Sequence, residues 1–110
     1  MSLSIIYSRA LSGIDAPLVT VETDLALGMP GFAIVGLPEK AVKESKDRVR
    51  STLLNTYFDF PARKITVNLA PADLPKEGGR FDLPIALGIL AAQDQFPISV
   101  LEEYEFAGEL

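Results

Sequence analysis

The stretch Ile65 to Leu90, ITVNLAPADLPKEGGRFDLPIALGIL, constrains the fold most, because its hydrophobic period changes within a few residues. Ile65, Val67 and Leu69 alternate with polar residues, which is typical of a strand with one buried face. A loop with two prolines, a lysine, a glycine pair and an arginine follows; we call residues 71–81 the glycine loop. Such a strand, loop and helix start often builds an anion site or a nucleophile turn.

The residues after the glycine loop predict a buried helix. Apolar residues recur there at helical spacing, at Leu83, Ala86, Leu87, Leu90 and Ala91. Asp82 is a suitable N-cap, and Pro84 is tolerated in a first turn. Gly88 costs roughly 1 kcal/mol against alanine inside a helix, so we expect it to mark close packing against a sheet.

The first 36 residues predict three strands joined by turns. Residues 3–10 suit a strand, and residues 19–25 alternate cleanly between apolar and polar. Residues 32–35 are wholly apolar, which favours a more buried strand. Short connections between the three predict a meander.

A second amphipathic helix is expected after Gly36, with Pro38 and Glu39 in its first turn. Val42, Val49 and Leu53 form its apolar stripe. Another strand is predicted to begin at residues 105–110, where the chain stops, so we expect residues 1–110 to be one domain and a piece of a longer protein. The order β-β-β-α-β-α-β predicts an α/β (α+β) two-layer sandwich, with a mixed β-sheet and helices on one face.

Composition excludes several kinds of site. The 110 residues contain no cysteine and no histidine, which excludes disulfides, most zinc sites and a Ser-His or Cys-His catalytic pair within them. The sequence lacks a basic segment before its short N-terminal apolar run and any membrane-length apolar run, so we expect a cytoplasmic protein without a membrane partner.

Charge is unevenly distributed along the chain. Residues 40–80 carry nine of the ten basic residues and five acids, a balance of +4, whereas the remainder has a balance of −9. A chain with net charge −5 is a poor nucleic-acid binder by itself, although one basic face could contact phosphates as one of several copies. The alternative is that these cations only form the hydrated surface of a helix and bind no partner.

The glycine loop is the first candidate site. Gly78 and Gly79 allow positive φ and close approach of a ligand, and Lys76 and Arg80 add two cations near a helix start. This pattern indicates a phosphate or carboxylate site. It is equally compatible with a turn whose cations are exposed or paired with acids. On the preceding helix, the cations that share one face are Lys43, Lys46 and Arg50. No G-x-x-x-x-G-K-[ST] motif occurs, so ATP hydrolysis is not located here.

Two long segments, GLPEKAVKESKDRVRSTL and NLAPADLPKEGGRFDLPIA, closely resemble the N-terminal domain of the ComM/YifB family of magnesium-chelatase-like AAA+ ATPases. The resemblance covers nearly the whole chain. It implies a ribosomal-protein-S5-domain-2-like fold akin to the Lon proteolytic domain, followed by an AAA+ module that would bind ATP and Mg²⁺. It also implies a homo-hexameric motor that acts on DNA, a helicase that promotes branch migration in natural transformation.

The kinship with Lon can be compared residue by residue. Lon-type proteases carry their serine in a P-K-D-G-P-S-A-G loop. Residues 75–78, Pro-Lys-Glu-Gly, match this pattern, whereas Gly79 falls on its second proline and Arg80 on the nucleophile. An arginine has no hydroxyl and stays protonated, so the pattern indicates a retained scaffold without protease chemistry.

We therefore expect a non-catalytic accessory domain with no cofactor of its own, which contacts DNA, helps a ring assemble, or both. A purely structural oligomerisation module is the alternative. Two remote alternatives are a magnesium chelatase subunit and a degenerate peptidase that uses Ser45, Ser51 or Ser99. The residues assigned to the DNA or intersubunit face are Lys43, Lys46, Arg50, Lys76, Gly78, Gly79 and Arg80.

Overall fold

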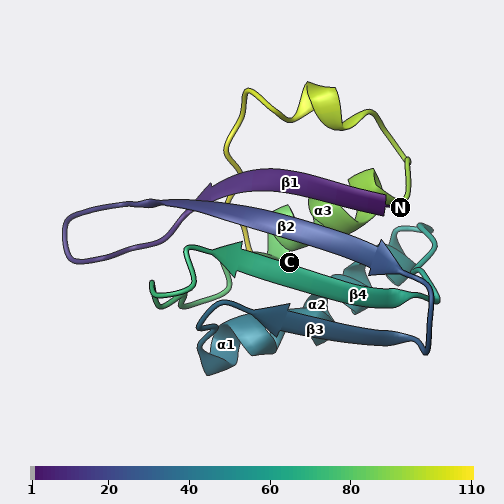
Figure 1. Cartoon of the computed structure of the whole chain (residues 1–110), viewed down its shortest axis with the longest axis horizontal. Coiled ribbons are helices and arrows are strands. Elements are labelled where there is room, and N and C mark those ends of the chain that lie inside the picture. Colours follow the sequence, from purple (N-terminus) through teal and green to yellow (C-terminus); the bar gives the residue numbers. More distant parts are fainter. Residues whose placement is uncertain (1) are drawn as a thin grey trace.

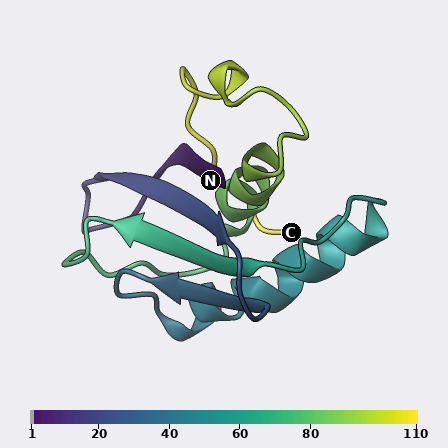
Figure 2. The same cartoon turned by 45° about the vertical axis from the view of Figure 1, so that its right-hand side comes forward.

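The computed structural model describes residues 2–110 and has two layers, a four-stranded mixed sheet and helices on one of its faces (Figures 1 and 2). In chain order the elements are β1 (Ser2–Arg9), β2 (Leu18–Ala26), β3 (Gly31–Val35), α1 (Lys40–Lys43), α2 (Ser45–Asn55), β4 (Lys64–Ala70), α3 (Asp82–Ala92) and the short 3-10 helix η1 (Ile98–Val100). The predicted α/β two-layer architecture is confirmed. No helix within residues 2–110 has the length and apolar composition needed to cross a bilayer.

The order of the strands in the sheet is β1-β2-β4-β3. β1 pairs with β2 and β2 pairs with β4, both antiparallel, whereas β3 pairs with β4 in parallel. The predicted meander is therefore correct for β1 and β2 and wrong for β3. The connection from β3 to β4 runs through α1 and α2, and such a crossover brings the chain back parallel to the strand it left.

The core lies between the sheet and the helices. Alternate residues of β1, β2 and β4 point into it, and Ile6, Val21 and Val67 are completely buried. The prediction that β3 is a more buried strand is wrong, because β3 is an edge strand and alternates between exposed and half-buried residues. Only Phe32 and Ile34 of β3 pack against the core.

The helices differ from prediction at their ends. The helix expected after Gly36 is divided at Glu44 into α1 and α2. α3 is almost entirely buried, as expected, but its N-cap position is Phe81, so the prediction of Asp82 as N-cap is wrong. The Asp82 carboxylate makes no capping bond and turns instead to side chains of α2.

Gly88 confirms the predicted close packing of α3 on the sheet. Its carbonyl oxygen accepts a hydrogen bond from the Ser4 hydroxyl of β1 at 2.7 Å. A Cβ at Gly88 would lie 2.5 Å from Oγ1 of Thr23 on β2.

The segment after α3 arches along the free edge of β1 and returns toward the start of α3 (Figure 1). The strand predicted at residues 105–110 is present only as a single parallel bridge between Tyr7 and Glu105. The N–H of Phe106 donates to the carbonyl oxygen of Tyr7 at 2.8 Å. Beyond this bridge the chain bonds to the region around α3 rather than to β1.

Candidate nucleic-acid interface

Lys76, the first cation of the glycine loop, lies completely inside the protein. Its Nζ donates hydrogen bonds to the carbonyl oxygens of Gly36, at 2.7 Å, and of Pro71. Its backbone N–H donates to Leu37 and its backbone carbonyl accepts from Glu39. Lys76 thus fastens the glycine loop to the connection between β3 and α1, and its charge is not accessible to a phosphate.

Burial lowers the pKa of the Lys76 ammonium below its ordinary value, and the nearby Asp73 carboxylate opposes this shift. The two carbonyl oxygens supply partial negative charge, which favours the protonated form, but no carboxylate is hydrogen-bonded to Nζ among the described residues. Lys76 is therefore a structural cation held by backbone dipoles.

Asp82 is the buried anion of the region, and its partners are residues of α2 rather than Lys76 or Arg80. Its carboxylate accepts hydrogen bonds from Nε of Arg48 at 2.7 Å and from Nη2 at 3.1 Å. The hydroxyl of Ser45 donates to the same carboxylate. This hydrogen bonding raises the pKa of Arg48 further above its ordinary value. The cluster ties α2 to the first turn of α3.

The start of α3 is occupied by the protein's own groups. The N–H of Leu83 donates to the carbonyl oxygen of Gly108 at 3.0 Å, and the N–H of Leu110 donates to Asp82 Oδ2 at 3.1 Å. At this helix start, where the sequence suggested an anion site, the N–H of Leu83 is therefore already bonded to the segment 108–110, while the Asp82 carboxylate faces α2.

The remaining residues of the glycine loop lie nearer the surface. Gly78 is exposed and has φ +76°, so its conformation uses the freedom of glycine, whereas Gly79 packs against the side chain of Glu109. Arg80 is half-buried, lines a small hollow with Leu11 and Glu77, and makes no ion pair among residues 2–110. Of the two predicted loop cations, only Arg80 is available to a partner.

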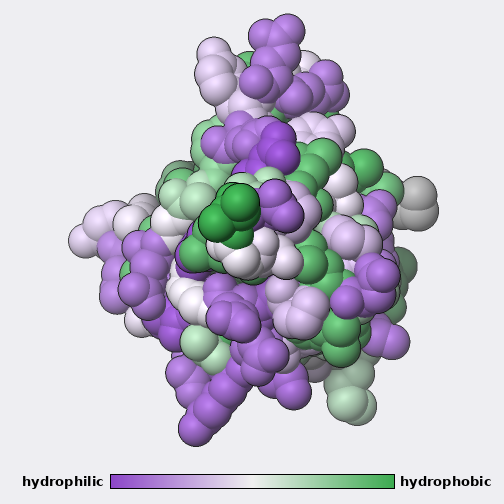
Figure 3. All heavy atoms as spheres, turned by 90° about the vertical axis from the view of Figure 1, so that its left-hand side faces the viewer, coloured by the Kyte–Doolittle hydropathy of each residue, from purple (hydrophilic) through white to green (hydrophobic). Residues whose placement is uncertain are grey.

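The predicted cations of the helix face are accessible. Lys43 and Arg50 are exposed, Lys46 is half-buried, and Lys40 of α1 is a further exposed cation. None of these four has an ion-pair partner within residues 2–110. Figure 3 views the end of the molecule at which β1 and β2 are connected, and hydrophilic side chains project at its lower margin. Three exposed carboxylates, those of Glu39 and Glu44 at the ends of α1 and of Asp47 on α2, lower the net positive charge of this region.

Sequence reasoning missed the surroundings of Arg50. The guanidinium carbon of Arg50 lies 5.1 Å from the ring centroid of Phe60, and the rings of Phe60 and Phe32 are 5.8 Å apart. These residues line a hollow of about 150 Å³ together with Arg63. The sequence signal was the run FDFPARK at residues 58–64, where aromatic residues, proline and cations alternate.

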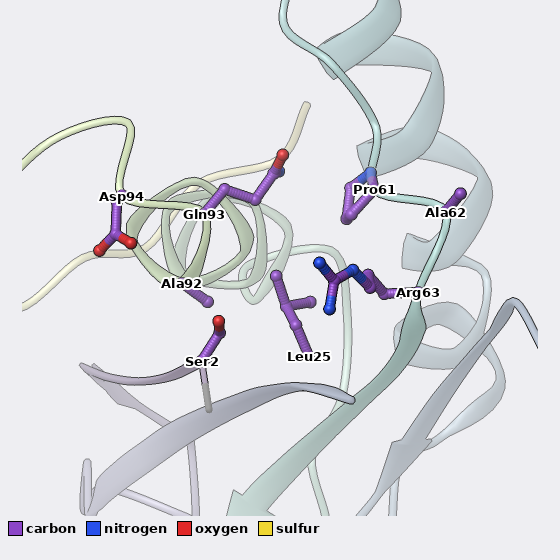
Figure 4. A pocket seen from close by; sticks show the side chains of 8 residues that line it. All are labelled: Ser2, Leu25, Pro61, Ala62, Arg63, Ala92, Gln93 and Asp94. Carbon is purple, nitrogen blue, oxygen red and sulfur yellow. The ribbon is translucent and has the colours of Figure 1, made fainter. Parts of the chain in front are cut away.

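A second, wider hollow of about 400 Å³ shares Arg63 and Pro61 with the first. Figure 4 shows the guanidinium of Arg63 extending toward Leu25, with Gln93 at the end of α3 on the opposite side. Arg63 therefore stands between two neighbouring hollows at the end of the sheet where β4 begins.

The serines of the peptidase alternative do not share a site. Ser45 is completely buried, and its hydroxyl is engaged by Asp82 and Arg48. Ser51 of α2 and Ser99 of η1 are exposed on separate elements. Within the described residues, 2–110, no group of three or more His, Cys, Asp or Glu side chains is placed to hold a metal ion.

Known proteins share the sequence that builds this region. The family described as subunit ChlI of Mg-chelatase matches residues 21–110. Over all 110 residues the chain is 67% identical to the competence protein ComM of Haemophilus influenzae and 58% identical to the uncharacterized protein YifB of Escherichia coli. It is 40% identical to an uncharacterized protein of Mycobacterium tuberculosis. The chain spans 22% of the length of each of these relatives.

Proposed function

The chain belongs to the Mg-chelatase subunit ChlI family and corresponds to the N-terminal part of ComM- and YifB-like proteins, and on this premise we propose that it is the non-catalytic accessory domain of an AAA+ motor that acts on DNA. In this proposal ATP and Mg²⁺ bind the AAA+ module of the longer protein. The motor is a cytoplasmic hexamer, and it drives branch migration during recombination in natural transformation.

The observation that carries the proposal is the accessible cationic face of α1 and α2, made by Lys40, Lys43, Lys46 and Arg50. Cations without protein partners can neutralise phosphates, and the resulting release of counterions favours binding to DNA. The net charge of −5 makes each copy weak by itself. Several copies in a ring would act together on one DNA molecule.

The test is the salt dependence of duplex DNA binding by the full-length protein. Lys43→Gln should weaken binding and reduce the slope of log K against log salt by about 0.9 for each lost phosphate contact. Arg9→Gln is the matched control, since it removes one cation on β1 that is already paired with Glu105. Equal slopes for both variants and the wild type would show that this face does not contact DNA.

A second candidate function, ring assembly, is favoured by the separation of charge on the molecule. The exposed acids Glu102 and Glu103 follow η1. The segment that contains η1 lies at the top of Figure 1, whereas α1 lies at the bottom. Head-to-tail contact between unlike surfaces is the way in which rings close. In that case Lys43→Gln shifts the size of the assembly, measured by light scattering, at concentrations where the wild type is fully assembled.

A further inference from the structure

The hollow around Arg50 combines stacking surfaces with unpaired cations. Its walls are the rings of Phe32 and Phe60, the prolines Pro30 and Pro61, and the side chains of Arg50 and Arg63. We call these six residues the aromatic–arginine pocket. No carboxylate lines it, although the whole chain has more acids than bases. The local environment therefore favours an anionic ligand that also has a flat, apolar face.

In the pocket an arginine already lies over an aromatic ring, and a second ring lies beside the first. The guanidinium of Arg50 lies over one ring, 5.1 Å from the centroid of Phe60, and the ring of Phe32 lies 5.8 Å from that of Phe60 with an interplanar angle of 34°. Arg50 itself is exposed. The face of its guanidinium turned away from Phe60 can therefore receive another planar group.

Arg63 extends the site toward the wider hollow. It is exposed, lines both hollows, and makes no ion pair within residues 2–110. A chain with a phosphate beside Arg63 could place one unit in the aromatic–arginine pocket and the next toward Gln93 (Figure 4). The Asp94 carboxylate at the far end of the wider hollow disfavours a phosphate there, which leaves Arg63 as the phosphate position.

We propose that the aromatic–arginine pocket binds one nucleotide of a single-stranded nucleic acid. The base stacks on the Arg50 guanidinium, which is itself stacked on Phe60, and Arg63 neutralises the adjacent phosphate. Aromatic and arginine stacking next to cations is the usual way to hold unpaired bases without reading their sequence. A duplex cannot use such a site, because its bases are already stacked on one another. The assignment rests on the proposed DNA function and adds the form of nucleic acid and the place of contact.

The decisive experiment is photocrosslinking of the full-length protein to an oligothymidine that carries 5-iododeoxyuridine, with peptides mapped by mass spectrometry. We expect crosslinks in the segments that carry Arg50 and Phe60. In parallel, Phe60→Leu and Arg50→Lys should weaken single-strand binding by about five- to tenfold, the weaker end of base–aromatic stacking, with little change for a blunt duplex. Arg50→Lys retains the charge and so separates stacking from electrostatics.

Phe58→Leu is the matched control, because Phe58 is an exposed phenylalanine two residues away that does not line the pocket. Equal single-strand affinities for Phe58→Leu, Phe60→Leu and Arg50→Lys, with no crosslink in this domain, would overturn the proposal. Equal losses on duplex and single strand would also overturn it, since they indicate a general electrostatic contact.

The two proposals fail separately. If Lys43→Gln changes the salt slope while the pocket variants bind normally, the DNA face stands and the single-strand pocket is wrong. If none of these variants differs from its control, both assignments are wrong. A change in assembly size for Phe60→Leu, with single-strand affinity unchanged, would assign the pocket to ring assembly instead.

Discussion

Replacing Asp82 by alanine should destabilise the domain more than any other single removal of a charged side chain from the glycine-loop region. The Asp82 side chain is completely buried and accepts hydrogen bonds from Ser45, Arg48 and the N–H of Leu110. Its loss leaves the Arg48 guanidinium and a buried hydroxyl without their acceptor. It also frees the segment that covers the start of α3.

The size of the effect follows from the burial of the pair. Breaking a buried ion pair by removing one partner costs about 3–5 kcal/mol. The Arg48 side chain is 26% exposed, so water can recover part of its solvation, and we expect about 3 kcal/mol. For a domain of this size that corresponds to a fall in Tm of roughly 10–15 °C.

The assay is urea and thermal unfolding of the 110-residue chain, with Asp73→Ala as the matched control because Asp73 is an exposed acid of the same loop. The control should change the free energy of unfolding by less than about 0.5 kcal/mol. A double-mutant cycle with Ser45→Ala should give a coupling energy of about 1 kcal/mol. A loss below about 1 kcal/mol for Asp82→Ala, or strict additivity with Ser45→Ala, would refute the reasoning.

Three further predictions concern other parts of the fold. Gly36→Ala should lower the free energy of unfolding in urea by about 2–4 kcal/mol, because Gly36 has φ +107° and a Cβ there would clash with a backbone carbonyl oxygen of β4. Gly78→Ala, whose Cβ would meet open space, should lower it by about 1 kcal/mol. Burial lowers the Lys76 pKa, so between the folded and unfolded pKa values the unfolded state binds more protons. The free energy of unfolding, measured with urea, should therefore rise with pH in that window, and this rise should be absent in Lys76→Met. The hydrogen bond from Arg9 lowers the Glu105 pKa, so its contribution is present above the unfolded value and is lost as pH falls through the folded value. The protection factor of the Phe106 amide, which is the intrinsic exchange rate divided by the observed rate, should therefore fall across that window in the wild type and stay constant in Arg9→Gln.

The sequence predicted the elements well, because alternation and helical spacing are local signals. It failed on the place of β3, because the choice between pairing with β2 and pairing with β4 depends on the crossover through α1 and α2 rather than on the strand's own residues. An apolar run such as Phe32–Val35 fits a central strand or an edge strand equally well.

The candidate site was predictable in part. Helical spacing grouped Lys43, Lys46 and Arg50 on one helix face; the structure places Lys43 on α1 and the other two on α2, with Lys43 and Arg50 exposed and Lys46 half-buried. It could not reveal that Arg50 lies over Phe60, because those residues belong to different segments that only the fold brings together. Nor could the sequence show that Lys76 is buried and Arg80 is not. A lysine between prolines and glycines is expected to be exposed unless the positions of the surrounding backbone carbonyls are known.

The burial of Lys76 changes what the similarity to the Lon loop means. Lys76 matches that pattern, and in this chain it joins the carbonyl oxygens of Gly36 and Pro71 across the glycine loop, which is a structural role and not a catalytic one. The position that aligns with the nucleophile holds Arg80, a half-buried cation close to the surface. A match at residues that only shape a loop concerns the path of the loop, and it does not identify a residue that reacts or binds. We therefore seek the function on the accessible cations of α1 and α2 and in the aromatic–arginine pocket.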